Sequence, residues 1–399
     1  MKQLSEETTR FIAEHRNDNV RDLALKCGKA NHVDMAEAIV QIAGWQIAEK
    51  KIPLWANTEG MLYPKHLSME QCSSETTARY KAALVSGKSF ADLTAGFGVD
   101  CSFIARNFET AHYVERQEEL CEIAENNFHR LGLDHIEVHH ADGTDYLQTM
   151  APVDCLFLDP ARRDSNGGKT VSIADCEPDV CQLEETLVRK GKTVMIKLSP
   201  MLDIFSAIRD LKYIRQIHIV AVNNECKELI TVLSKQEINT QQSEDEVIIC
   251  CEQVVNNSGS QHFDFTYTQE RNAQCTYANK LGNYLYEPGA ALLKAGAFRL
   301  LSERFGTRQL SANSHLYTSA NLVDFPGRRF HIEAVSGFSK KELKELLKDV
   351  SQANITVRNF PQTVAELRKK LKLKDGGNIY LFATTLYDGS KVLIKCTKA

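Results

Sequence analysis

The stretch that decides the fold is Phe90–Gly98, FADLTAGFG, which runs into a helical pattern over Val99–Asn107. Apolar residues around Asp92 predict a short buried strand, and Gly96 and Gly98 predict a tight turn after it. The first N–H groups of the helix then lie free at the end of the strand. Such turns are common in α/β proteins, so this one does not identify a ligand by itself.

Strand and helix signals alternate over residues 88–235, which predicts a parallel sheet covered by helices. Two further strand signals, Ile214–Val222 and Glu228–Ser234, are joined by a connection too short for a helix, so they should pair antiparallel. The five strands expected before them are Phe90–Leu93, Ala111–Glu115, Ile136–His140, Val153–Leu158 and Thr193–Leu198.

Acidic residues recur where these strands are expected to end. Glu115 ends the second strand, Asp142 follows the third and Asp159 follows the fourth. At the shared carboxyl edge, Glu115 can accept hydrogen bonds from both hydroxyls of a ribose. Asp142 suits an exocyclic amine such as that of adenine, and Asp159 faces the reaction centre. Each acid could instead cap the next helix, but together with the glycine turn they favour a nucleoside-containing cofactor.

With these features, residues 88–235 resemble a class I S-adenosylmethionine-dependent methyltransferase. The resemblance implies a Rossmann-like α/β fold with a seven-stranded sheet whose last two strands form an antiparallel hairpin, and S-adenosylmethionine as cofactor. Thr94 departs from the pattern, because many members have a glycine there; it shapes the methionine end of the site or only fits the turn. The cofactor-binding residues that the resemblance implies are Asp92, Leu93, Thr94, Ala95, Gly96, Phe97, Gly98, Glu115, Arg116, Asp142, Gly143 and Asp159.

The family's fourth motif maps onto Asp159-Pro160-Ala161-Arg162, where alanine and arginine replace the second proline and the aromatic residue of many amino-methyltransferases. The resemblance implies that Asp159 positions the acceptor. Arg162 and Arg163 could contact phosphate or stack on a base, or form a surface ion pair with Asp164 or Asp175. The candidate catalytic residues are thus Asp159, Pro160, Arg162 and Arg163. Ser199 follows the fifth strand where related RNA enzymes often carry a nucleophilic cysteine, which disfavours covalent cysteine catalysis.

The remaining segments predict further domains. Residues 1–87 predict a helical domain with no evident chemistry, and residues 236–329 a connecting, ferredoxin-like segment. Residues 330–399 read as β-α-β-α-β-β, with capping boxes at Ser339/Glu342 and Thr363/Glu366. The helices expected in the first segment are Glu6–His15, Val20–Cys27, His32–Lys50 and Ser68–Val85, the last with a capping box at Ser68/Gln71.

From about Leu67 onward, the chain resembles bacterial methyltransferases with a C-terminal THUMP-like domain. The runs that carry this resemblance are MEQCSSETTARYKAALVSGKSFADLTAGFGVD, DPARRD and YEPGAALLKAGAF. THUMP domains deliver RNA, usually tRNA, to a modifying domain, so the resemblance implies an RNA partner.

Charge is distributed unevenly along the chain. Residues 280–399 hold 20 Lys and Arg against 10 Asp and Glu, a balance of +10, and with a total of −4 the rest carries −14. A basic part of this kind fits a polyanion, although two offsetting solvated surfaces would give the same totals. We expect no membrane segment, no exported leader and a cytoplasmic protein. The twelve cysteines form no C-x-x-C pair, so we expect reduced thiols and no metal.

Three functions compete at this point. The first is S-adenosylmethionine-dependent methyl transfer to a nucleobase of RNA, with tRNA among the candidates. The second is a nucleic-acid-binding protein whose methyltransferase-like fold is a non-catalytic scaffold. The third, a nicotinamide-dependent dehydrogenase, is disfavoured because Cys101 occupies the third glycine position of G-x-G-x-x-G.

Overall fold

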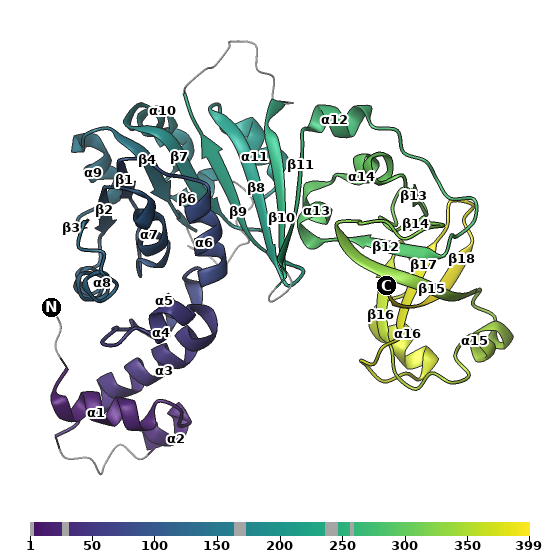
Figure 1. The fold of residues 1–399 in the computed structure, drawn as a ribbon, viewed down its shortest axis with the longest axis horizontal. Coiled ribbons are helices and arrows are strands. Elements are labelled where there is room, and N and C mark those ends of the chain that lie inside the picture. Colours follow the sequence, from purple (N-terminus) through teal and green to yellow (C-terminus); the bar gives the residue numbers. More distant parts are fainter. Residues whose placement is uncertain (1–3, 26–31, 163–172, 236–245, 256–258) are drawn as a thin grey trace. The chain divides into compact units, whose positions relative to one another are not determined.

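The computed structural model describes residues 4–25, 32–162, 173–235, 246–255 and 259–399 (Figure 1). Internal contacts divide the chain into two compact units. One comprises Met1–Arg215 with Ile230–Gln241, and the other comprises Gln216–Leu229 with Gln242–Ala399. The polar stretch expected at 235–246 falls mostly outside the described residues.

The first unit begins with helices. Ser5 caps the first of them by accepting a hydrogen bond from Thr8 N. The single helix expected over Ser68–Val85 is wrong, because Ser74 accepts a hydrogen bond from Thr77 N and starts a new helix. Ser68 consequently lies inside a helix and forms no capping box. These helices are α1 (Glu6–His15), α2 (Val20–Leu25), α3 (Met35–Lys51), α4 (Pro53–Ala56), α5 (His66–Gln71) and α6 (Glu75–Ala83).

A large sheet follows, with the strand order β11-β10-β8-β9-β7-β4-β1-β2-β3. The seven expected strands occupy successive places from β8 to β3, and two more strands continue the sheet beyond β8. Asn223 and Asn224 join β8 to β9 with positive φ angles of 51° and 64°, the two-residue turn of an antiparallel hairpin. The strands are β1 (Ser89–Asp92), β2 (Thr110–Glu115), β3 (Ile136–His140), β4 (Val153–Leu158), β7 (Gly191–Leu198), β8 (Ile214–Val222), β9 (Glu225–Leu233), β10 (Ile248–Val255) and β11 (Gly259–Phe265).

Helices connect the parallel strands β1, β2, β3, β4 and β7, as the alternating sequence pattern predicts. A short ladder, β5 (Ala161–Arg162) with β6 (Cys176–Glu177), follows β4. The helices are α7 (Val99–Ile104), α8 (Glu118–Arg130), α9 (Gly143–Thr149), α10 (Val180–Lys190) and α11 (Ile204–Asp210). Trp55 and Met69 from the N-terminal helices share a hydrophobic cluster with Phe97 and Phe103, so these helices pack on the region of α7.

In the second unit a seven-stranded sheet has the order β13-β14-β12-β15-β18-β17-β16. Residues 327–398 follow the predicted β-α-β-α-β-β order, and both predicted capping boxes are confirmed. β15 also pairs with β12, so this segment shares one sheet with the residues before it. The elements are α12 (Tyr267–Asn272), β12 (Tyr284–Pro288), α13 (Ala290–Ala295), α14 (Phe298–Phe305), β13 (Arg308–Gln309), β14 (Tyr317–Ser319), β15 (Gly327–Ser336), α15 (Lys340–Leu346), β16 (Asn354–Arg358), α16 (Val364–Leu371), β17 (Tyr380–Thr385) and β18 (Lys391–Lys398).

Within the described ranges, no helix is both long enough and apolar enough to cross a membrane.

Candidate functional site

The glycine turn lies at the carboxyl end of β1, as expected. Gly98 precedes α7 with a φ of 85°, a left-handed conformation that favours glycine. The N–H of Gly96 donates to Glu115 Oε2 at 2.9 Å, and the hydroxyl of Tyr113 donates to the Gly96 carbonyl oxygen at 2.5 Å. Both partners come from β2, so the next strand fixes the turn.

Glu115 is buried at the end of β2. Its second oxygen, Oε1, accepts a hydrogen bond from Gln117 N at 2.9 Å. An ionised carboxylate offers about four lone-pair sites, and these two backbone donors occupy two of them. The carboxylate is therefore held rigidly and can still accept two further hydrogen bonds.

Asp142 and Gly143 follow β3. Asp142 caps α9, because its Oδ1 accepts from Thr144 N at 2.8 Å and from the Thr144 hydroxyl, which lowers the pKa of the carboxyl. A Cβ at Gly143 would lie 2.0 Å from the Leu93 carbonyl oxygen. The absence of a side chain at Gly143 thus brings the loop after β3 against the loop after β1. Asp142 can therefore cap α9 and also lie beside the glycine turn.

Thr94 links two strand ends. Its N–H donates to Asp92 Oδ1 at 3.1 Å, and its hydroxyl oxygen accepts from Asp159 N at 2.6 Å. Asp92 is fully buried, and this burial raises the pKa of its carboxyl. The residue that departs from the family's glycine pattern therefore connects the loop after β1 to the loop after β4.

Asp159 forms an ion pair with Lys197, which lies on β7. Lys197 Nζ is 2.5 Å from Asp159 Oδ2 and 3.8 Å from Asp100 Oδ2. Enclosure by the protein raises the pKa of the Asp159 carboxyl, and the nearby ammonium of Lys197 opposes that shift. The Asp159 side chain nevertheless remains 39% exposed, whereas that of Lys197 is 12% exposed, so the carboxylate is the accessible member of the pair.

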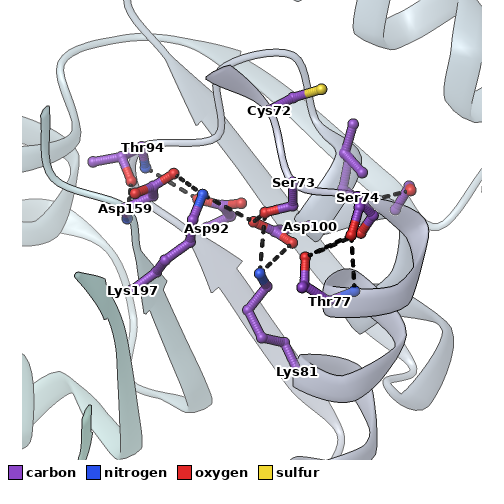
Figure 2. Close-up of polar contacts among 12 residues, drawn as sticks. Cys72, Ser73, Ser74, Thr77, Lys81, Asp92, Thr94, Asp100, Asp159 and Lys197 are labelled. Atoms are coloured by element: carbon purple, nitrogen blue, oxygen red, sulfur yellow. Dashed lines mark hydrogen bonds and ion pairs between the residues drawn. The ribbon is translucent and has the colours of Figure 1, made fainter. Parts of the chain in front are cut away.

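Behind this pair lies a buried polar cluster, formed by Ser73, Lys81 and Asp100 (Figure 2). Lys81 reaches from α6 to Asp100 Oδ1 at 3.1 Å and donates to Ser73 Oγ at 3.0 Å, with its side chain completely buried. Ser73 in turn donates to Asp100 Oδ2 at 2.7 Å. Charges thus alternate along the series Lys81, Asp100, Lys197 and Asp159.

Sequence reasoning missed this cluster, because Ser73 and Lys81 belong to the helical segment to which it assigned no chemistry. A signal was present: a lysine on the apolar face of a helix is rarely buried unless it is paired.

Other predicted residues lie close by in different roles. The ring of Phe97 packs edge-on against Trp55 at 4.8 Å, and Ala95 N donates to the Val114 carbonyl oxygen. Arg116 is exposed and lies 3.5 Å from Glu177. Pro160 is buried, and the backbone of Arg162 pairs with Cys176. Arg163 lies outside the described residues.

The arrangement offers carboxylates from the ends of β1, β2, β3 and β4 around one glycine turn. Hydrogen bonds fix the turn from two sides, through Glu115 and through Thr94. The edge of the sheet thus gathers a rigidly held carboxylate, a helix-capping acid and an ion pair whose carboxylate is accessible.

Three family models match successive parts of the chain. Residues 34–164 match protein-L-isoaspartate(D-aspartate) O-methyltransferase, residues 284–326 match a ferredoxin-like domain, and residues 327–398 match a THUMP domain-like family. No curated protein matches the sequence.

A full-length relative decides the family. The crystal structure described as "putative methyltransferase from Porphyromonas gingivalis W83" is 34% identical, with a TM-score of 0.89 and all of both chains covered. The chain belongs to this methyltransferase family. Its methyltransferase fold and its C-terminal THUMP-like and ferredoxin-like domains are those that the sequence resemblance implied.

More distant structures are similar to part of the chain only. An O-methyltransferase from Bacillus cereus in complex with SAH is 14% identical, with a TM-score of 0.35, and covers 48% of this chain and 90% of its own. TrmK of M. capricolum, in complex with the product S-adenosyl-homocysteine, is 12% identical, with a TM-score of 0.33, and covers 43% of this chain and 73% of its own.

Proposed function

We propose that the protein transfers a methyl group from S-adenosylmethionine to a nucleobase of RNA, with tRNA among the candidate substrates. The observation that carries the proposal is the set of strand-end acids fixed around the Gly96–Gly98 turn, in a chain whose full-length relative is described as a methyltransferase.

The residues fit such a cofactor. Glu115 keeps acceptor capacity for two ribose hydroxyls, and hydrogen bonds to a charged group contribute about 1.5–3 kcal/mol each. Asp142 lies beside the turn for the base, and Arg116 flanks the ribose acid. We propose that the turn itself contributes its main chain, with Phe97 supporting it from the hydrophobic core. The full proposed set is Asp92, Leu93, Thr94, Ala95, Gly96, Phe97, Gly98, Glu115, Arg116, Asp142, Gly143 and Asp159.

The cofactor supplies a methyl group that its sulfonium already activates. The protein's task is therefore chiefly to align the acceptor with that carbon. Asp159 is the residue we assign to the acceptor, with Pro160, Arg162 and Arg163 beside it. The hydroxyl of Thr94 fixes the backbone at Asp159 relative to the glycine turn, so acceptor and cofactor are aligned by one short hydrogen bond.

Lys197 gives Asp159 its working charge state. An ionised carboxylate accepts a hydrogen bond from an acceptor amine, and the ammonium at 2.5 Å favours that ionised form. The cluster behind it, Lys81 with Asp100, holds Lys197 from the buried side.

The RNA partner is supported by the THUMP-like match and by exposed lysines in the second unit. At the end of α16 and just beyond it, Lys369, Lys370, Lys372 and Lys374 are all exposed. A helix C-terminus favours such cations, and lysines of this kind neutralise phosphates.

The transfer is tested with radiolabelled S-adenosylmethionine and two RNA preparations, from a deletion strain and from the wild type. We expect label only in RNA from the deletion strain, because the target in wild-type RNA is already methylated. The Asp159→Asn variant should leave both unlabelled. Equal labelling of both preparations would contradict a specific RNA substrate.

RNA binding is tested separately by its salt dependence. The double variant Lys369→Ala/Lys374→Ala should bind RNA more weakly, with a salt slope smaller by about one for each phosphate that is no longer neutralised. The control is Lys50→Ala/Lys65→Ala, which removes two exposed lysines from the N-terminal helical segment. An equal reduction of affinity in both variants would contradict a site at α16.

A second acceptor class follows from the match of residues 34–164 to the isoaspartate O-methyltransferase model. An isoaspartyl peptide is therefore included in the transfer assay. If label entered the peptide and not RNA, we would conclude that the methyl acceptor is a protein carboxylate and not a nucleobase. If the protein bound S-adenosylhomocysteine but transferred no label to RNA or to the peptide, the result would favour the alternative of a nucleic-acid-binding protein with a non-catalytic methyltransferase-like fold.

A further inference from the structure

Apart from the acids at the carboxyl edge, β2 and β3 carry a second group of potential ligands. The strands pair in parallel, with His112 opposite Glu137 and Val114 opposite His139. Residues that face each other across two strands, or lie two apart on one strand, share a face of the sheet. His112, Glu137 and His139 therefore project together, on the strand that ends the large sheet and on its neighbour.

The three ligand atoms form a nearly regular triangle. His112 Nδ1 lies 3.1 Å from His139 Nε2 and 3.4 Å from Glu137 Oε2, and His139 Nε2 lies 3.7 Å from Glu137 Oε2. Three ligands at about 2.0–2.1 Å around a tetrahedral zinc ion are separated from one another by about 3.3–3.4 Å. The observed separations, 3.1, 3.4 and 3.7 Å, bracket that spacing.

We propose that His112, Glu137 and His139 bind a divalent transition-metal ion of the zinc class. Two imidazoles and one carboxylate form a ligand set that suits Zn²⁺ and Co²⁺. The fourth position is left for water, and the hydroxyl of Tyr146 on α9 lies 3.3 Å from His139 Nε2, next to the ligand atoms.

The ion would cross-link β3, the strand at the edge of the large sheet, to its neighbour β2. Among the described strands, β3 pairs with β2 alone, and an ion shared by His112 of β2 and two residues of β3 cross-links that pair. Sequence patterns do not signal the site, because 27 residues separate His112 from His139 and only the strand register brings them together. The site uses none of the residues assigned to the methyl-transfer reaction.

A hydrogen bond between the two imidazoles also accounts for the 3.1 Å separation of His112 Nδ1 and His139 Nε2. The two explanations differ in what they predict: a hydrogen-bonded pair needs no ion and does not require Glu137. Glu137 is 71% exposed, so its replacement by glutamine tests the proposal without disturbing the core.

The test is a Co²⁺ titration of the full chain after dialysis against a chelator. We expect one ion per chain, with the intense visible absorption of tetrahedral cobalt, and displacement of that ion by Zn²⁺. Glu137→Gln and His139→Gln should each weaken binding by more than the roughly 10–100-fold that loss of an outer-shell partner costs. His129→Gln is the control, because His129 pairs with a single acid, Asp134.

The unfolding temperature provides a second readout. Zn²⁺ should raise it in the wild type and in His129→Gln, but not in Glu137→Gln, because an ion that binds only the folded state stabilises it. Failure of wild-type protein to bind Co²⁺, equal binding by all variants, or an absorption band of thiolate ligands would each overturn the proposal. Circular dichroism verifies that every variant is folded.

Discussion

Two acids, one in each unit, are paired with basic side chains and differ in how much of the carboxylate remains exposed. Glu287 on β12 is only 2% exposed, with Arg328 on one oxygen and Arg358 on the other, at 2.9 Å. Asp159 has Lys197 on one oxygen, and its side chain is 39% exposed. The first carboxylate is enclosed by its partners, whereas the second is held by one lysine and remains partly exposed.

The surroundings of these two acids distinguish a structural charge from the one that we propose acts in methyl transfer. Glu287 joins β12 to Arg328 on β15 and Arg358 on β16, so its partners hold a sheet together. Asp159 lies at a strand end beside a glycine turn, and the lysine that pairs with it also lies 3.8 Å from a buried acid, Asp100. Both acids are paired, but Asp159 is the one whose side chain is exposed.

The largest effect should come from the buried end of the charge series. Lys81→Met would leave Asp100 buried without its closest cation, and loss of one partner of a buried pair costs about 3–5 kcal/mol. Urea unfolding of the full chain should show that loss. Lys88→Met, at an exposed lysine before β1, is the control. A loss below about 1 kcal/mol at Lys81 would show that the series does not stabilise the fold.

Substitution of the two acids should give opposite results. Asp159→Asn should lower the rate of methyl transfer by about 100-fold or more, as loss of one aligned polar group does in other enzymes, with little change in stability. Glu287→Gln should cost about 2–3 kcal/mol of stability and leave S-adenosylhomocysteine affinity unchanged. If Asp159→Asn instead lowered the stability and left the rate of methyl transfer unchanged, Asp159 would be the structural acid, and the assignment would be contradicted.

Lys197→Met should change the pH dependence of the reaction. Removal of the ammonium takes away the main interaction that opposes burial, so the pKa of the Asp159 carboxyl should rise further. The ionised form is then lost at a higher pH, and the acid limb of the pH–rate profile should move upward. A profile that keeps its acid limb in place while the rate falls would indicate that Lys197 does not act through Asp159.

Much of the first unit could be predicted from sequence, because its signals are local. Alternating strand and helix patterns placed Glu115, Asp142 and Asp159 at strand ends, and parallel sheets bring such ends to one edge. Both predicted capping boxes of the second unit are present, because they involve residues only three apart.

Features that depend on packing could not be predicted in this way. Ser73 and Lys81 enter the site because α6 packs against α7, an arrangement that no periodicity reveals. The break between α5 and α6 leaves Ser68 inside α5 and gives the capping role to Ser74, a choice that the spacing of residues alone did not reveal. The metal ligands proposed on β2 and β3 depend on strand register, which the sequence of one chain does not fix.

The most direct test is calorimetry of S-adenosylhomocysteine binding to the wild type and to Glu115→Gln, with Glu118→Gln as control. We predict one site per chain in the wild type and in the control, and affinity lower by about tenfold or more in Glu115→Gln, since each lost charged hydrogen bond costs about 1.5–3 kcal/mol. No heat with the wild type, or equal affinity in all three proteins, would contradict a nucleoside site at these strand ends.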